Sequence, residues 1–124
     1  MVPGSARLLI ALACAVFPAT SLLAHHSFAP KYDPAKPVRV SGVVGSVSLQ
    51  NPHSYFEIDA GAKTWRVETE GVAAAKAAGL STDNLKQGVK VSVSGWLARD
   101  GSPSLGLHTI TIGGKTLTMR RSAR

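Results

Sequence analysis

The chain has 124 residues, a formal net charge of +7 and one cysteine, Cys14. This length accommodates one domain of ordinary size together with a short targeting segment. Because Cys14 lies in the segment that we expect to be removed, disulfides, thiolate metal sites and cysteine nucleophiles are excluded from the mature chain.

Residues 1–24 have the pattern of a signal peptide. Arg7 precedes an apolar run over residues 8–17, and residues 22–24 resemble a cleavage site. The apolar run is too short to span a bilayer. Cleavage after Ala24 would make His25 the first residue, although a site a few residues earlier is an alternative. We therefore expect a periplasmic or secreted protein whose mature chain has no transmembrane segment.

The mature chain starts with an arm over residues 25–37. Its three prolines oppose a helix and favour an extended conformation. A long strand over residues 38–49 follows, and its apolar residues change phase near Gly42. A glycine at a phase change favours a bulge or bend, which allows one strand to serve two halves of a barrel.

The dipeptide Asn51-Pro52 predicts a turn, so we expect the next strand to start at His53. Alternation along residues 53–59 separates a core face from an outer face. The core face carries Phe56 and Ile58, and the outer face carries His53, Tyr55 and Glu57. A third strand over residues 63–68 would pair with this one and bring Glu68 or Glu70 opposite His53.

The alanine-rich residues 71–78, followed by Gly79, predict a short helix. Strands are expected over residues 89–97 and 105–112, with a short sixth over residues 116–119 and a basic tail over residues 120–124. Three strands, a helix and two strands is the order of an OB barrel. We predict an all-β fold with one short helix, a five- to six-stranded OB-like Greek-key barrel over residues 38–119. An open antiparallel sheet or a small sandwich is the alternative.

Three histidines form a candidate metal site: His25, His26 and His53. If His25 is the first residue, its amino group and its imidazole form a chelate that a further imidazole can complete. A site with only nitrogen ligands favours copper over nickel and zinc. A carboxylate from Glu68 or Glu70 could orient the ring of His53. The predicted cofactor is therefore copper. A flexible chain start and a surface histidine are the simpler interpretation.

The outer face of the second and third strands is a candidate ligand-binding surface, with Tyr55, Arg66, Glu68 and Trp96 as its residues. OB barrels bind oligonucleotides or oligosaccharides on this face. Export and the nearby glutamates argue against a nucleic acid. A small ligand or an envelope protein is the expected partner, through a peptide, glycan or protein contact that needs no metal. We expect no enzyme, because no nucleophile elbow or phosphate-binding loop is present.

The sequence resembles domain-of-unknown-function family 6152, whose members are small exported bacterial proteins. The motifs that carry the resemblance extend over nearly the whole mature chain: His25-His26-Ser27-Phe28, Tyr32-Asp33-Pro34, Asn51-Pro52-His53, residues 65–68 and Ala98-Arg99-Asp100-Gly101-Ser102. Gln87 stands where the family pattern has proline, in a loop away from these motifs. The resemblance implies export and a compact β domain, and it supplies no activity.

Overall fold

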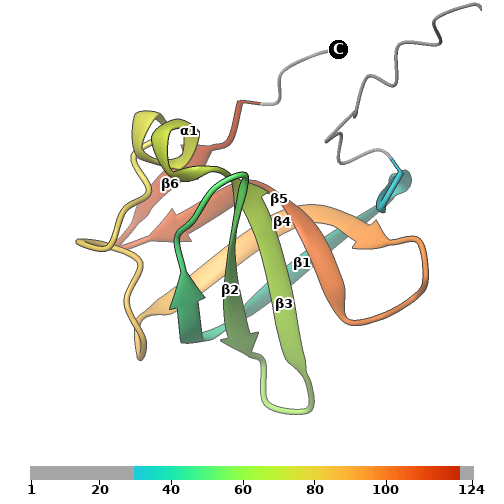
Figure 1. Ribbon diagram of the computed structural model, residues 1–124. Helices are drawn as coiled ribbons and strands as arrows, with labels where there is room; N and C mark the ends of the chain where they lie inside the picture. Colours follow the sequence, from blue (N-terminus) through green and yellow to red (C-terminus); the bar gives the residue numbers. More distant parts are fainter. Residues whose placement is uncertain (1–29, 121–124) are drawn as a thin grey trace, which may run out of the picture.

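A computed structural model describes residues 30–120 of the chain, so the predicted signal peptide, His25 and His26 lie outside the described residues. The described chain forms a small barrel with one helix beside it (Figure 1). The elements are β1 (Tyr32–Ser48), β2 (His53–Asp59), β3 (Thr64–Glu70), α1 (Val72–Ala77), β4 (Lys90–Ala98), β5 (Ser104–Ile112) and β6 (Lys115–Thr118).

The strands form one sheet in the order β3-β2-β1-β4-β5-β6, which closes on itself through a pairing of β3 with β5. The closing pair is parallel, with Val67 opposite Leu105, whereas the other neighbours are antiparallel. Five strands thus make a closed barrel, and β6 extends it from β5. The predicted all-β OB-like barrel with one short helix is confirmed.

The long first strand serves two halves of the barrel, as its change of phase predicted. Residues before Val43 pair with β4, residues after it pair with β2, and Val43 itself has partners on both strands. The irregularity in the pairing with β2 lies between Val44 and Val47 instead of at Gly42. β1 begins at Tyr32 instead of Val38, so the end of the predicted arm belongs to the sheet.

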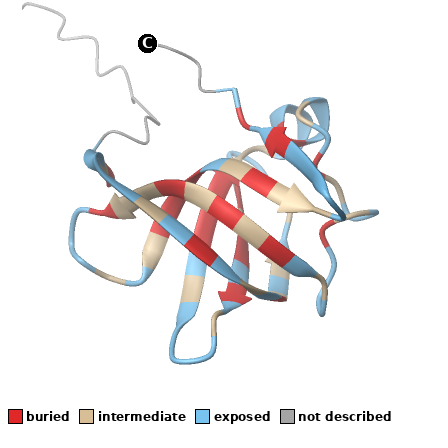
Figure 2. Ribbon diagram, turned by 180° about the vertical axis from the view of Figure 1, so that it is seen from behind, coloured by how far each residue is buried: buried red, intermediate tan, exposed pale blue. Residues whose placement is uncertain are grey.

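The core fills the barrel with side chains from the strands, and Figure 2 shows buried residues alternating with intermediate or exposed ones along much of the ribbons. Phe56, Ile58 and Val67 are buried at its centre, and Trp65 packs against it in part. The helix α1 lies at one end beside β6 (Figure 1) and contributes Ala75. After Gly79 the chain forms one hydrogen-bonded turn, in which the backbone N–H groups of Asn84 and Leu85 both donate to the carbonyl oxygen of Ser81.

Two glycines allow strand backbones to approach each other closely. A Cβ atom on Gly42 would lie 2.1 Å from the backbone oxygen of Asp59, and one on Gly95 would lie 1.9 Å from the backbone oxygen of Gly106. Neither oxygen can move without breaking the sheet pairing around it. Gly42 therefore allows β1 to lie close to Asp59 of β2 because it has no side chain, and it does not form a bulge.

We predict that Gly42→Ala lowers the free energy of unfolding by at least ~2 kcal/mol, because the added methyl group overpacks a backbone contact. Gly45→Ala is the matched control on the same strand, since its Cβ would meet Glu57 Cβ at an ordinary 3.5 Å. The control is expected to change stability by no more than about 0.5 kcal/mol. Urea denaturation of the two variants measures the difference, and equal midpoints would contradict the close approach.

Candidate functional site

The turn before β2 places His53 at the rim of the barrel, as predicted. The side-chain oxygen of Asn51 accepts a hydrogen bond from the backbone N–H of Val72 at 3.0 Å, which ties the turn to the start of α1. Asn51-Pro52, a cis peptide bond, leads directly into β2 at His53. The histidine side chain is 16% exposed, so its ring lies largely against the protein.

Glu68 of β3 is the carboxylate that contacts His53. Glu70 is the direct partner of His53 in the strand register, and Glu68 is the partner of Tyr55. The diagonal contact nevertheless brings His53 Nδ1 to 2.5 Å from Glu68 Oε1. Of the two carboxylates that the sequence offered, the structure therefore selects Glu68.

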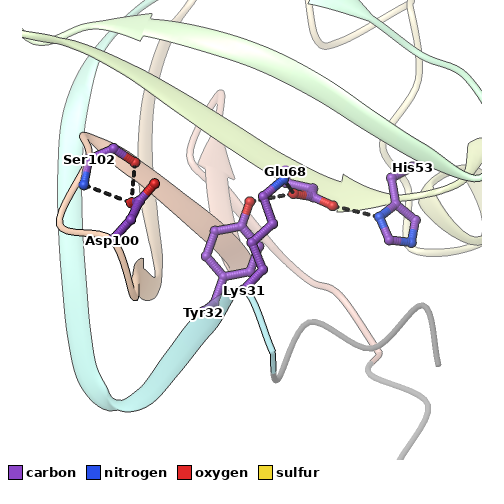
Figure 3. A network of polar contacts seen from close by, with 6 residues as sticks. All are labelled: Lys31, Tyr32, His53, Glu68, Asp100 and Ser102. Atoms are coloured by element: carbon purple, nitrogen blue, oxygen red, sulfur yellow. Dashed lines mark hydrogen bonds and ion pairs between the residues drawn. The ribbon is translucent and has the colours of Figure 1, made fainter.

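The second oxygen of the same carboxylate binds the residues at the start of the described chain. Lys31 Nζ donates to Glu68 Oε2 at 2.6 Å, and the Tyr32 hydroxyl donates to the same oxygen. Figure 3 shows Lys31 and Tyr32 on one side of the Glu68 carboxylate and His53 on the other. One buried carboxylate thus links β1, β2 and β3. We call Lys31, Tyr32, His53 and Glu68 the Glu68 network.

The network is buried unevenly. The Glu68 side chain is 4% exposed and Tyr32 is 1% exposed, whereas Lys31 is half-exposed. Tyr32 is not part of the main core cluster. The exposed lysine pair is worth at most about 1 kcal/mol. The buried tyrosine and histidine contacts therefore provide most of the stabilisation.

The partners of Glu68 keep it ionised. Burial raises the pKa of this carboxyl, but hydrogen bonds from Lys31, Tyr32 and His53 outweigh that effect, so its pKa lies below the usual value of 4.5. Because the carboxylate accepts, the His53 nitrogen that faces it carries the proton. Burial, and then the hydrogen bond to Glu68, raises the pKa of the Tyr32 hydroxyl, which stays neutral.

Tyr55 lies next to the network, and two cations lie against its ring. Arg66 Cζ lies 4.2 Å from the centre of the Tyr55 ring, and Lys31 Nζ lies 5.5 Å from it. Both distances are within the range of cation–π attraction. Tyr55 and Arg66 also line a groove of about 270 Å³ that continues along β1 to Ser46. The structure therefore brings together three of the four predicted ligand-binding residues: Tyr55, Arg66 and Glu68.

Trp96, the fourth, belongs to a different part of the surface. It pairs with Pro37 and Gly106 in the register of β4, and its ring centre lies 5.0 Å from that of His108. Among the described residues, the depressions that contain Trp96 and Tyr55 have no lining residue in common. His108 is exposed on β5, which is paired on both sides, with β4 and with β6.

Of the three predicted metal ligands, the structure describes His53. Residues 30–120 contain no group of three histidine, cysteine, aspartate or glutamate side chains arranged to hold a metal ion. A metal at His53 would therefore need ligands from outside the described residues. Within the same range, no helix has the length and apolar character needed to cross a membrane.

Sequence reasoning did not assign Lys31 and Tyr32 to the site. The signal that could have indicated them is Tyr32 itself, a large aromatic residue within a proline-rich arm, which must be buried against something. The lysine gave no signal, because lysines are common on any surface. Their contact with Glu68 joins positions 36 and 37 residues apart along the chain.

We predict that Glu68→Gln lowers the free energy of unfolding at pH 7 by about 2 kcal/mol, through loss of charged hydrogen bonds to buried partners. Because the folded-state pKa is lowered, this stabilisation is present above pH 4.5 and is lost as the pH falls through the folded-state value. Denaturation of both proteins from pH 7 to pH 2, with a chelator present, should therefore show converging stabilities. Glu57→Gln, an exposed position on β2, is the control with no such loss. A constant difference over this pH range would contradict the ionised network.

Comparison with known proteins identifies the family. The model of a family of unknown function, DUF6152, matches residues 11–108. No curated protein matches the chain. Among solved structures, the chain is similar to apo TiaS (tRNAIle2 agmatidine synthetase), with 20% identity and a TM-score of 0.47 over 61% of this chain and 18% of that one. It is also similar to yeast Stn1 and Ten1, with 12% identity and a TM-score of 0.44 over 68% of this chain and 43% of that one.

The chain therefore spans less than half the length of either of these two structures, and the likeness concerns the fold alone. The family match, by contrast, covers most of the chain and includes all four residues of the Glu68 network. This chain is a member of the DUF6152 family.

Proposed function

We propose that the protein is an exported binding protein that holds a copper ion with His53 and nitrogen ligands from the start of its mature chain. The observation that carries the proposal is the position of Glu68, whose two oxygens contact His53 and Lys31 respectively. Lys31, where the chain enters the barrel, and the His53 ring therefore contact the same carboxylate. The proposed role is binding without catalysis.

The contact with Glu68 suits His53 to a metal. A carboxylate that accepts from one ring nitrogen fixes the tautomer, so that the other nitrogen, Nε2, presents its lone pair. Histidine ligands in metal proteins commonly have such a partner, which also makes the ring a stronger ligand. Glu68 would thus orient the ligand without binding the metal itself.

The required chain length is available. His26 precedes Lys31 by five residues, which reach at most about 18 Å when extended. Because Lys31 Nζ and His53 Nδ1 contact the same carboxylate, this reach supports a contact between the start of the mature chain and His53. An amino group with several imidazoles is a nitrogen-only ligand set, for which Cu²⁺ has the highest affinity among the common divalent metals.

The test begins with mass spectrometry of the exported protein, which should show His25 as its first residue. Calorimetric titration with Cu²⁺ should then give a Kd of micromolar or lower. His53→Ala should weaken binding at least tenfold, and Glu68→Gln by about tenfold or more, as expected for loss of an orienting partner. His108→Ala is the matched control, because this histidine lies on β5 and has no place in the proposed site.

Two results would contradict the copper proposal. A mature chain that starts elsewhere would lack the amino-terminal chelate. If His53→Ala binds copper as tightly as the parent protein, His53 is not a ligand.

A second candidate function is a metal-free interaction module of the cell envelope that binds a peptide, glycan or protein through the Tyr55 face. The cation–π contacts of Arg66 and Lys31 with the Tyr55 ring support it, because they hold an aromatic side chain that lines a groove. Aromatic and arginine side chains contribute strongly to binding at protein interfaces.

For this candidate, we predict that a pull-down from envelope extract in the presence of a copper chelator captures a partner. Tyr55→Ala should reduce capture at least tenfold, because it removes both the ring and the stacking of Arg66. Lys90→Gln, an exposed change at the start of β4, is the control and should capture as the parent does. Equal capture by Tyr55→Ala would count against the Tyr55 face.

A further inference from the structure

We propose that the depression around Trp96, His108 and Arg39 is a second binding site, which takes a small acidic sugar. It lies on the outer face of β1, β4 and β5, away from both the Glu68 network and the Tyr55 groove. The inference concerns a separate surface, so it does not depend on the copper proposal.

A β-bulge brings the two aromatic rings together. In the pairing of β4 with β5, Ser94 is opposite Thr109 and Gly95 is opposite Leu107, so His108 is an extra residue without a counterpart on β4. Bulges turn side chains away from the regular alternation and occur often beside functional sites. At this bulge β4 and β5 lie close together, because Gly95 has no side chain and its backbone lies against Gly106.

The result is a ring pair that forms one wall of a depression. The rings of Trp96 and His108 have centres 5.0 Å apart and planes inclined at 54°. Pro37, the register partner of Trp96, contributes further apolar surface from β1. The depression has a volume of about 410 Å³, within the range of small-molecule sites.

The charges around the depression favour an anion. Arg39 lines it from β1, and His108 adds a basic group, whereas none of the described residues that line it is acidic. Arg39 belongs to none of the ion pairs formed within residues 30–120. A guanidinium group binds a carboxylate through two parallel hydrogen bonds, so Arg39 can hold an acid group at the rim.

Aromatic walls and a cation together indicate the ligand class. A sugar ring has a face of C–H groups that packs on the negative face of an indole. Its hydroxyls suit a site lined by Ser94, whose hydroxyl oxygen lies 2.5 Å from that of Thr109. A uronic acid adds the carboxylate that Arg39 requires. A hexuronate also fits the available volume, which supports this class over a longer peptide.

The test uses tryptophan fluorescence. The chain has two tryptophans, so Trp65→Phe leaves Trp96 as the reporter. Galacturonic acid titrated into this protein should change its fluorescence in a saturable way, with a Kd in the micromolar to millimolar range. Arg39→Gln in the same background should weaken binding at least tenfold. Arg120→Gln, an exposed arginine outside the depression, is the matched control and should bind as the Trp65→Phe protein does.

Calorimetric titration of the parent protein and of Arg39→Gln repeats the comparison without the Trp65 change. Arg39→Gln and Arg120→Gln both alter exposed arginines, so neither is expected to impair folding. The proposal is overturned if the parent protein shows no saturable binding, or if Arg39→Gln binds as tightly as the parent. Equal binding of neutral galactose would overturn the assignment of an acidic ligand.

Discussion

When a carboxylate is buried, hydrogen-bonding or charged partners must replace the water that its charge has lost, and in this protein that carboxylate is Glu68. Its side chain is almost fully buried, and its two oxygens contact His53, Tyr32 and Lys31. These partners come from β2 and from the start of β1, whereas Glu68 itself belongs to β3, so the network joins the start of β1 to the β2–β3 hairpin. The need to pair one charge thus determines where the chain enters the barrel and how the His53 ring is oriented.

The closed barrel determines which side chains can act together. Tyr55, Arg66 and Glu68 lie on neighbouring strands and form one group, whereas Trp96 does not join them. The reason is topological, because β5 lies between β3 and β4 in the closed sheet. Gly106 of β5 is the register partner of both Glu68 and Trp96, so a full strand separates the two side chains.

The two surfaces differ in the way their side chains are held. Around Glu68, charged hydrogen bonds orient a histidine, which is the arrangement that a metal ligand needs. Around Trp96, a bulge places one extra residue of β5 beside an indole, and the depression carries positive charge. The first surface is the one for which we propose a metal at the amino-terminal chain, and the second is the one for which we propose a small anion. Each can act without the other.

The sequence by itself determined the fold class and the position of His53. The signals for both are local: alternating valines, the order of strands and helix, and the Asn51-Pro52 turn. Each depends on residues that are neighbours in the sequence, so it can be recognised without knowing the tertiary structure. The tertiary structure alone decided that Glu68 and not Glu70 binds His53, that Lys31 and Tyr32 complete the network, and that His108 meets Trp96. These contacts depend on register, strand closure and one bulge. Register, strand closure and the bulge cannot be predicted from any single residue, because each arises from the pairing of segments that are distant along the chain.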